Sequence, residues 1–187
     1  MVMEKYNWKH LMEIEPRSSV TFGMIKPFLL PEHKVVLDVF CGFAPLHKHM
    51  ADREYFGYDS SEEAISSLRR DFPRGNWKVL RDSQFSFDGK IDVFIHLGIS
   101  AGERDTDSKI ETEVDSRIIG SCSPSLVILE TCAGHYDRIK AAKLPHHWDA
   151  INERVASKYR LLASEAFDSG IKRECVAKRV MNIYGVG

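Results

Sequence analysis

Short apolar runs separated by more polar segments organise the chain from residue 34 onward. Runs this short, rich in Val, Ile, Leu and aromatic residues, are typical of strands buried on both faces of a sheet. Five of them predict strands at Val35–Phe40, Tyr55–Asp59, Trp77–Asp82, Ile91–His96 and Ser125–Glu130. Two longer runs, Tyr159–Phe167 and Arg173–Tyr184, are separated by Asp168-Ser169-Gly170 and predict a closing β-hairpin.

Helix signals fall between these runs. Pro45 suits the first turn of a helix, and Ser60 followed by Glu63 forms a capping box. We expect helices within the first 30 residues, from Pro45 to about Arg53, from Ser60 to Phe72, from Thr106 to Gly120 and from Trp148 to about Ser157. Alternating strands and helices predict an α/β fold with a doubly wound, mostly parallel seven-stranded sheet, helices on both faces and an antiparallel C-terminal hairpin.

Composition limits the function classes. The chain has 187 residues, of which 43% are hydrophobic, and a net charge of −1, so no general positive field attracts nucleic acid. We expect one domain over residues 1–187, with an N-terminal helical segment (1–30) before the sheet-forming part (34–187). The four cysteines form no CxxC pair, and no apolar stretch approaches the roughly 20 residues that span a bilayer. These features predict a cytoplasmic protein without a structural metal or a membrane partner.

Acidic residues lie at or near the ends of the first three predicted strands: Asp38 lies near the end of the first, Asp59 ends the second and Asp82 ends the third. The fourth strand ends at His96, followed by Leu97 and Gly98. Ligands of doubly wound sheets bind beyond the carboxyl ends of the strands. We therefore expect these acids to converge on one binding site.

The segments at these strand ends resemble the motifs of class I S-adenosylmethionine-dependent methyltransferases, which have a Rossmann-like fold. LDVFCGFA is similar to the first motif of that family, GYDSSEEAI to the second, Leu80–Asp82 to the third and IDVFIHLG to the fourth. The resemblance implies S-adenosylmethionine as cofactor, with Asp59 on the ribose and Asp82 on the adenine. The cofactor-binding residues that it implies are Asp38, Phe40, Cys41, Gly42, Phe43, Asp59, Ser60, Asp82, Ser83, His96, Leu97 and Gly98.

The loop after the first strand departs from the usual pattern of that family, because Phe40 and Ala44 stand where glycines are common. The form Asp-x-Phe-x-Gly occurs in branches that modify nucleic acid. Dinucleotide binding is a competing hypothesis for this fold, but it needs a glycine-rich turn that cradles a pyrophosphate. Gly42 stands alone here, and Pro45 removes an amide donor, so the loop disfavours a dinucleotide.

The catalytic candidate is His96, at the tip of the fourth strand, although a histidine there also suits a purely cofactor-facing role. Four further residues are candidates for the acceptor site: Glu130 and His135 after the fifth strand, and Tyr6 and Trp8 in an N-terminal lid. Solvated loop positions and an amphipathic helix are the alternative interpretations of these four. On the last strand, we expect the basic residues Lys178 and Arg179 to form a solvated rim.

No motif in the sequence identifies the methyl acceptor. The absence of a net positive charge favours a small molecule, and RNA is the alternative acceptor. A non-catalytic S-adenosylmethionine-binding protein is the hypothesis of a different class, and the oligomeric state, a homodimer included, stays open.

Overall fold

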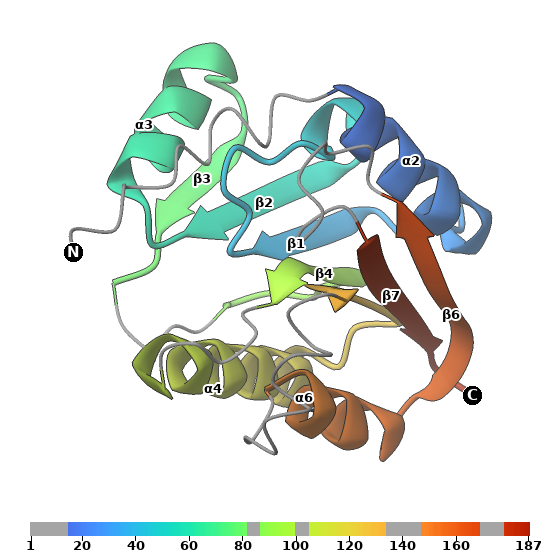
Figure 1. Ribbon diagram of the computed structural model, residues 1–187. Coiled ribbons are helices and arrows are strands. Elements are labelled where there is room, and N and C mark those ends of the chain that lie inside the picture. The colour runs from blue at the N-terminus through green and yellow to red at the C-terminus, as the bar shows by residue number, and fades with distance from the viewer. Residues whose placement is uncertain (1–14, 82–86, 100–104, 134–146, 169–177) are drawn as a thin grey trace.

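The computed structural model describes residues 15–81, 87–99, 105–133, 147–168 and 178–187. One sheet of seven strands, in the order β3-β2-β1-β4-β5-β7-β6, forms its centre (Figure 1). The strands are β1 (Val35–Val39), β2 (Glu54–Asp59), β3 (Asn76–Val79), β4 (Val93–Ile99), β5 (Leu126–Cys132), β6 (Arg160–Asp168) and β7 (Lys178–Gly185). Strands β1 to β5 pair in parallel, and β7 runs antiparallel to both β5 and β6. The predicted doubly wound sheet with a closing hairpin is confirmed.

Helices cover both faces of this sheet. They are α2 (Glu15–Ile25), α3 (Glu62–Asp71), α4 (Asp105–Cys122) and α6 (His147–Ala156), with single 3₁₀ turns η1 (Lys26–Phe28) and η2 (His47–Met50). Helices α4 and α6 lie on one face, and α2 and α3 on the other (Figure 1). Two apolar cores result, one on the α4/α6 face and one on the α2/α3 face.

Burial on both faces explains the apolar strands. In β1, Leu37 and Val39 join the core on the α4/α6 face, whereas Val36 joins the opposite core. All seven residues of β5 are buried. An alternating apolar and polar pattern would leave polar side chains inside one of the two cores, so these strands read as continuous apolar runs.

The segment after β1 differs from the prediction. In place of a helix from Pro45 to Arg53, it forms a tight loop followed by the single turn η2. The amide of Ala44 donates to the carbonyl of Cys41, and the amide of His47 donates to the carbonyl of Ala44, which is 3₁₀ bonding. Ala44 also has a φ of 46°, outside the helical region, so a regular α-helix does not start at Pro45.

Two element boundaries also shift. The cap of α3 is Ser61, whose hydroxyl accepts from the amide of Ala64 over 3.2 Å, so the predicted capping box at Ser60 is one residue early. Strand β4 begins at Val93 instead of Ile91 and continues to Ile99. Asp92 precedes it because its carboxylate accepts from the amides of Lys34 and Val35 at the start of β1.

Candidate functional site

Asp59, at the carboxyl end of β2, ties together the chain segments that leave β1 and β2. Its Oδ2 accepts from the amide of Gly42 over 2.7 Å, and its Oδ1 accepts from the amide of Ser61 over 2.7 Å. A carboxylate has about four lone-pair sites, so each oxygen keeps the capacity for another donor. The side chain is half-buried at the edge of the sheet, which leaves it accessible to a ligand.

The loop that Asp59 holds has an unusual backbone. Phe40, Gly42 and Ala44 all have positive φ values, of 53°, 53° and 46°. Such angles are uncommon for residues other than glycine, and backbone held in sparsely populated regions clusters at ligand clamps. The amide of Cys41 donates to the carbonyl of Tyr58, which fixes the start of the loop against β2. The geometry makes this loop a candidate binding element.

Asp38 lies behind the loop, in the interior of β1, with 1% of its surface exposed. The hydroxyl of Tyr55 donates to its Oδ2 over 2.5 Å, whereas its Oδ1 is fully buried without a hydrogen-bond partner in the described residues. Burial raises the pKa of Asp38 to about 7, and Asp59 adds to the rise, while the bond from Tyr55 and the nearby His96 oppose it. The site thus contains a buried carboxyl group with one unused acceptor oxygen.

His96 lies one strand further, on β4, and is fully buried. Its Nδ1 is 2.8 Å from Oδ2 of Asp115 on α4, and the ring of Phe40 lies against it with centroids 4.9 Å apart. Its Nε2 has no hydrogen-bond partner within the described ranges. Burial alone would lower the pKa of His96, but the carboxylates of Asp115 and Glu111 outweigh it, so this pKa lies above its usual value.

Comparisons with known proteins identify structures that are similar to this one. The chain matches no protein-family profile and no curated protein sequence. Among solved structures, it is similar to the N-methyltransferase NodS from Bradyrhizobium japonicum, with a TM-score of 0.66 and 10% identity over 91% of this chain and 97% of that one. It is similar to magnesium protoporphyrin IX methyltransferase from Synechocystis, determined with bound S-adenosylhomocysteine, with a TM-score of 0.61 and 14% identity over 92% and 83% of the two chains. A TehB-like methyltransferase from Corynebacterium glutamicum gives a TM-score of 0.60 and 15% identity over 96% and 94%.

This is the class I S-adenosylmethionine-dependent methyltransferase fold. Identities of 10–16% establish the fold alone. In this fold, the loop after β1 and the carboxyl ends of β2 and β4 lie along one edge of the sheet. Asp59 ends β2, whereas Asp38 lies just before the end of β1 and His96 lies within β4, three residues before its end.

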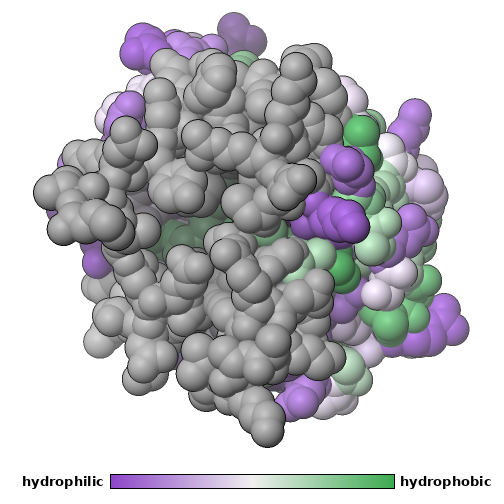
Figure 2. All heavy atoms as spheres, viewed as in Figure 1, coloured by the Kyte–Doolittle hydropathy of each residue, from purple (hydrophilic) through white to green (hydrophobic). Residues whose placement is uncertain are grey.

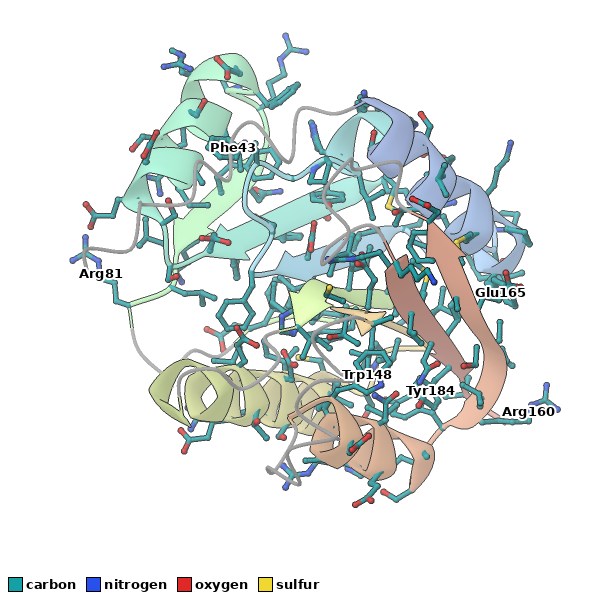
Figure 3. All side chains as sticks on the ribbon, in the orientation of Figure 1. Phe43, Arg81, Trp148, Arg160, Glu165 and Tyr184 are labelled. Atoms are coloured by element: carbon teal, nitrogen blue, oxygen red, sulfur yellow. The ribbon has the colours of Figure 1, made fainter. Side chains whose placement is uncertain are left out.

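Other predicted site residues are distributed along the same edge. Cys41 is buried, Phe43 is half-buried in the loop between β1 and η2 (Figure 3), and Ser60 is exposed. On β4, Leu97 is half-buried, and Gly98 is exposed with a φ of 82° at a bulge between Leu97 and Ile99. Five predicted site residues lie outside the described ranges: Tyr6, Trp8, Asp82, Ser83 and His135.

Glu130 on β5 and Arg179 on β7 lie further along the same edge, beyond β4. Glu130 is fully buried and accepts a hydrogen bond from Nε of Arg179, which is itself 6% exposed. The prediction of a solvated rim is therefore wrong for Arg179, although Lys178 is exposed. Neighbouring residues of a strand point to opposite faces, and Arg179 lies opposite Cys132 on the buried side of β7.

Sequence reasoning also missed two partners of the predicted residues. Tyr55 binds Asp38, and Asp115 binds His96. Both lie on elements that the pattern predicted, but a polar residue on a predicted strand or helix carries no sign of its partner. Among the described residues, no group of three or more His, Cys, Asp or Glu side chains is arranged to hold a metal ion, and no helix has the length and apolar character to cross a membrane.

Replacing Asp115 with asparagine is expected to lower the pKa of His96. The carboxylate of Asp115 stabilises the imidazolium, and an amide at the same place does not. The measurement is an NMR titration of the His96 imidazole in both proteins. Glu113→Gln is the matched control, because Glu113 is an exposed carboxylate on the same helix. An unchanged His96 titration in Asp115→Asn would contradict the pairing.

Proposed function

We propose that this protein is an S-adenosylmethionine-dependent methyltransferase that acts on a small-molecule acceptor. The observation that carries the proposal is the tether between Asp59 and Gly42, which fixes a strained loop and an accessible carboxylate at the carboxyl ends of adjacent strands. The fold shared with methyltransferases of known structure supports the choice of cofactor.

The residues present suit the chemical groups of that cofactor. Asp59 would accept hydrogen bonds from the ribose hydroxyls with the lone pairs that the amides of Gly42 and Ser61 leave unused. Asp38 would face the ammonium of the methionyl group, because its Oδ1 is an acceptor without a partner in the described part of the chain. When bound, S-adenosylmethionine supplies an activated methyl group on a sulfonium. The carboxylates of Asp38 and Asp59 suit such a positively charged ligand.

His96 is the proposed proton acceptor for the reaction. Asp115 engages its Nδ1, which leaves Nε2, a fully buried nitrogen without a partner among the described residues, as the atom that would take a proton from an acceptor hydroxyl or amine. The ring of Phe40 lies beside it, at the start of the strained loop. An acceptor that reached Nε2 would therefore lie against the same loop that holds the cofactor, which is the geometry that methyl transfer requires.

The test is calorimetry with S-adenosylmethionine and with its demethylated product, on wild type and Asp59→Ala. We expect micromolar binding by the wild type, about −8 kcal/mol, and at least a tenfold weaker affinity in the variant. Asp52→Ala is the control, because Asp52 is an exposed acid that precedes β2 at its opposite end. Thermal unfolding of each variant separates loss of ligand contacts from loss of the fold. Equal affinities in wild type and Asp59→Ala, or no binding by the wild type, would refute the proposal.

A further inference from the structure

Glu130 and Arg179 form a buried ion pair that the proposed reaction does not use. Glu130 has no exposed surface, and only 7% of the Arg179 side chain is exposed. Burying two charges is costly, and apolar residues of similar volume often stabilise a protein as well or better. The pair therefore calls for an explanation beyond stability.

The ion pair uses little of the guanidinium. Arginine has five N–H donors in a planar fork, and the described residues accept from one of them, at Nε. Oδ1 of Asp38 and Nε2 of His96 are fully buried polar atoms without a hydrogen-bond partner among the described residues. The Nη atoms of Arg179 do not belong to that group. Glu130 thus binds the guanidinium at Nε, and the two Nη nitrogens remain available to a planar anion.

The guanidinium of Arg179 lies at the edge of the sheet that the carboxyl ends of the parallel strands form. Because β7 runs antiparallel to β5, Arg179 at its start pairs with Cys132 at the carboxyl end of β5. A Cβ added to Gly98 would lie 3.5 Å from Nη2 of Arg179, and Gly98 is an exposed residue of the β4 bulge. Strands lie about 4.8 Å apart, so β7 is roughly 14 Å from β1, across β4 and β5.

We propose that Arg179, held in place by Glu130, recognises an oxyanion group of the methyl acceptor. This inference rests on the proposed methyltransferase function and adds a chemical class to the acceptor: a small molecule that carries a carboxylate or a phosphate. The cofactor would lie at β1 and β2, and the guanidinium lies at β7. An acceptor that spans this distance would have its reacting end near β4 and its anionic end at the guanidinium. Glycine at position 98 keeps the approach to Nη2 open.

The test is an NMR titration of the wild type and of the double variant Glu130→Met/Arg179→Met, with inorganic phosphate in one arm and acetate in the other, at constant ionic strength. The reporter is the arginine Nε–Hε resonance that the double variant lacks, together with neighbouring backbone amides. The wild type is expected to show saturable binding of one anion, and the double variant at least a tenfold weaker response. Arg160→Met is the control, because Arg160 is an exposed arginine that points away from the molecule on the edge strand β6 (Figure 3).

The tighter-bound anion distinguishes a phosphorylated acceptor from a carboxylic acid. Calorimetry of the same proteins with S-adenosylmethionine separates the two proposals, because the double variant is expected to bind the cofactor as the wild type does. If the wild type binds S-adenosylmethionine but neither anion saturates, or if the double variant binds the anions equally well, the inference about Arg179 fails alone. If the double variant loses cofactor binding, the guanidinium serves the cofactor and the inference is overturned. If the wild type does not bind S-adenosylmethionine, the proposed function fails, and the acceptor role of Arg179 fails with it.

Discussion

Replacing Arg179 with methionine is expected to lower the free energy of unfolding by about 3–5 kcal/mol, because the change removes the guanidinium that pairs with the buried carboxylate of Glu130. Glu130 has no exposed surface, and its partner in β7 is the guanidinium of Arg179. In the unfolded chain both groups are hydrated, so the loss falls on the folded state. Urea denaturation of wild type and variant at neutral pH measures the difference.

The double variant Glu130→Met/Arg179→Met is expected to recover most of that loss, since it removes both charges and keeps similar volume. Arg81→Met provides the surface comparison. Arg81 lies 3.7 Å from Glu62 with 80% of its side chain exposed, and it extends away from the molecule after β3 (Figure 3). A substitution there is expected to change stability by less than about 0.5 kcal/mol. If Arg179→Met were as mild as Arg81→Met, Glu130 would not be a buried charge.

The strands could be predicted because each apolar run is buried on both faces. In β1, alternate residues enter opposite cores, and β5 has no exposed position, so composition and length alone identify these segments. The segment after Pro45 could not be predicted in the same way. Its conformation depends on the positive φ of Ala44 and on the hydrogen bonds of the loop with β2, and these are set by the fold around it.

The residues of the candidate site also fall into a predictable and an unpredictable group. Asp38, Asp59 and His96 could be proposed from sequence because the ends of parallel strands meet at one edge. Their partners could not, since the pairs join positions far apart: Asp115 is 19 residues from His96, and Arg179 is 49 residues from Glu130. The contrast between Lys178 and Arg179 shows the difficulty. One faces solvent and the other is buried, and only the pairing of β7 with β5 decides which.

The surface over α2 and β6 differs from the carboxyl edge of the sheet, because its described residues include no buried charged groups. Over α2 and β6, on the right of Figure 2, hydrophobic and hydrophilic residues are intermixed. Exposed apolar residues such as Leu161 on β6 and Val20 on α2 are 49% and 41% exposed. Singly exposed apolar side chains are normal on a protein surface, so they indicate no binding function. The chemically unusual features are the buried charged groups at the carboxyl edge.

The second large effect is expected at Asp38, whose carboxyl group opposes folding as it ionises. Its pKa rises from 3.8 to about 7 on folding, chiefly through burial, so the folded state holds the proton more tightly than the unfolded chain. The stabilisation from this group is complete below about pH 4 and is lost as the pH rises to about 7, a change of roughly 4 kcal/mol. Asp38→Asn keeps an acceptor for Tyr55 and removes the titration. The difference in unfolding free energy between variant and wild type, measured in urea from pH 4 to 8, is therefore expected to shift in favour of the variant as the pH rises. Asp52→Asn, at an exposed position, is expected to show no such trend.

The same group would link stability to the proposed binding of S-adenosylmethionine. A cation placed beside Asp38 favours its carboxylate form and lowers its pKa. Near pH 7, where the free protein holds a proton there for part of the time, binding of S-adenosylmethionine is expected to release that proton. Calorimetry in two buffers of different ionisation enthalpy measures the release, which is expected to disappear in Asp38→Asn. Proton release of equal size in wild type and Asp38→Asn would show that the ammonium does not approach Asp38. A release confined to the wild type would explain why a carboxyl group that destabilises the free protein at neutral pH lies buried near the end of β1.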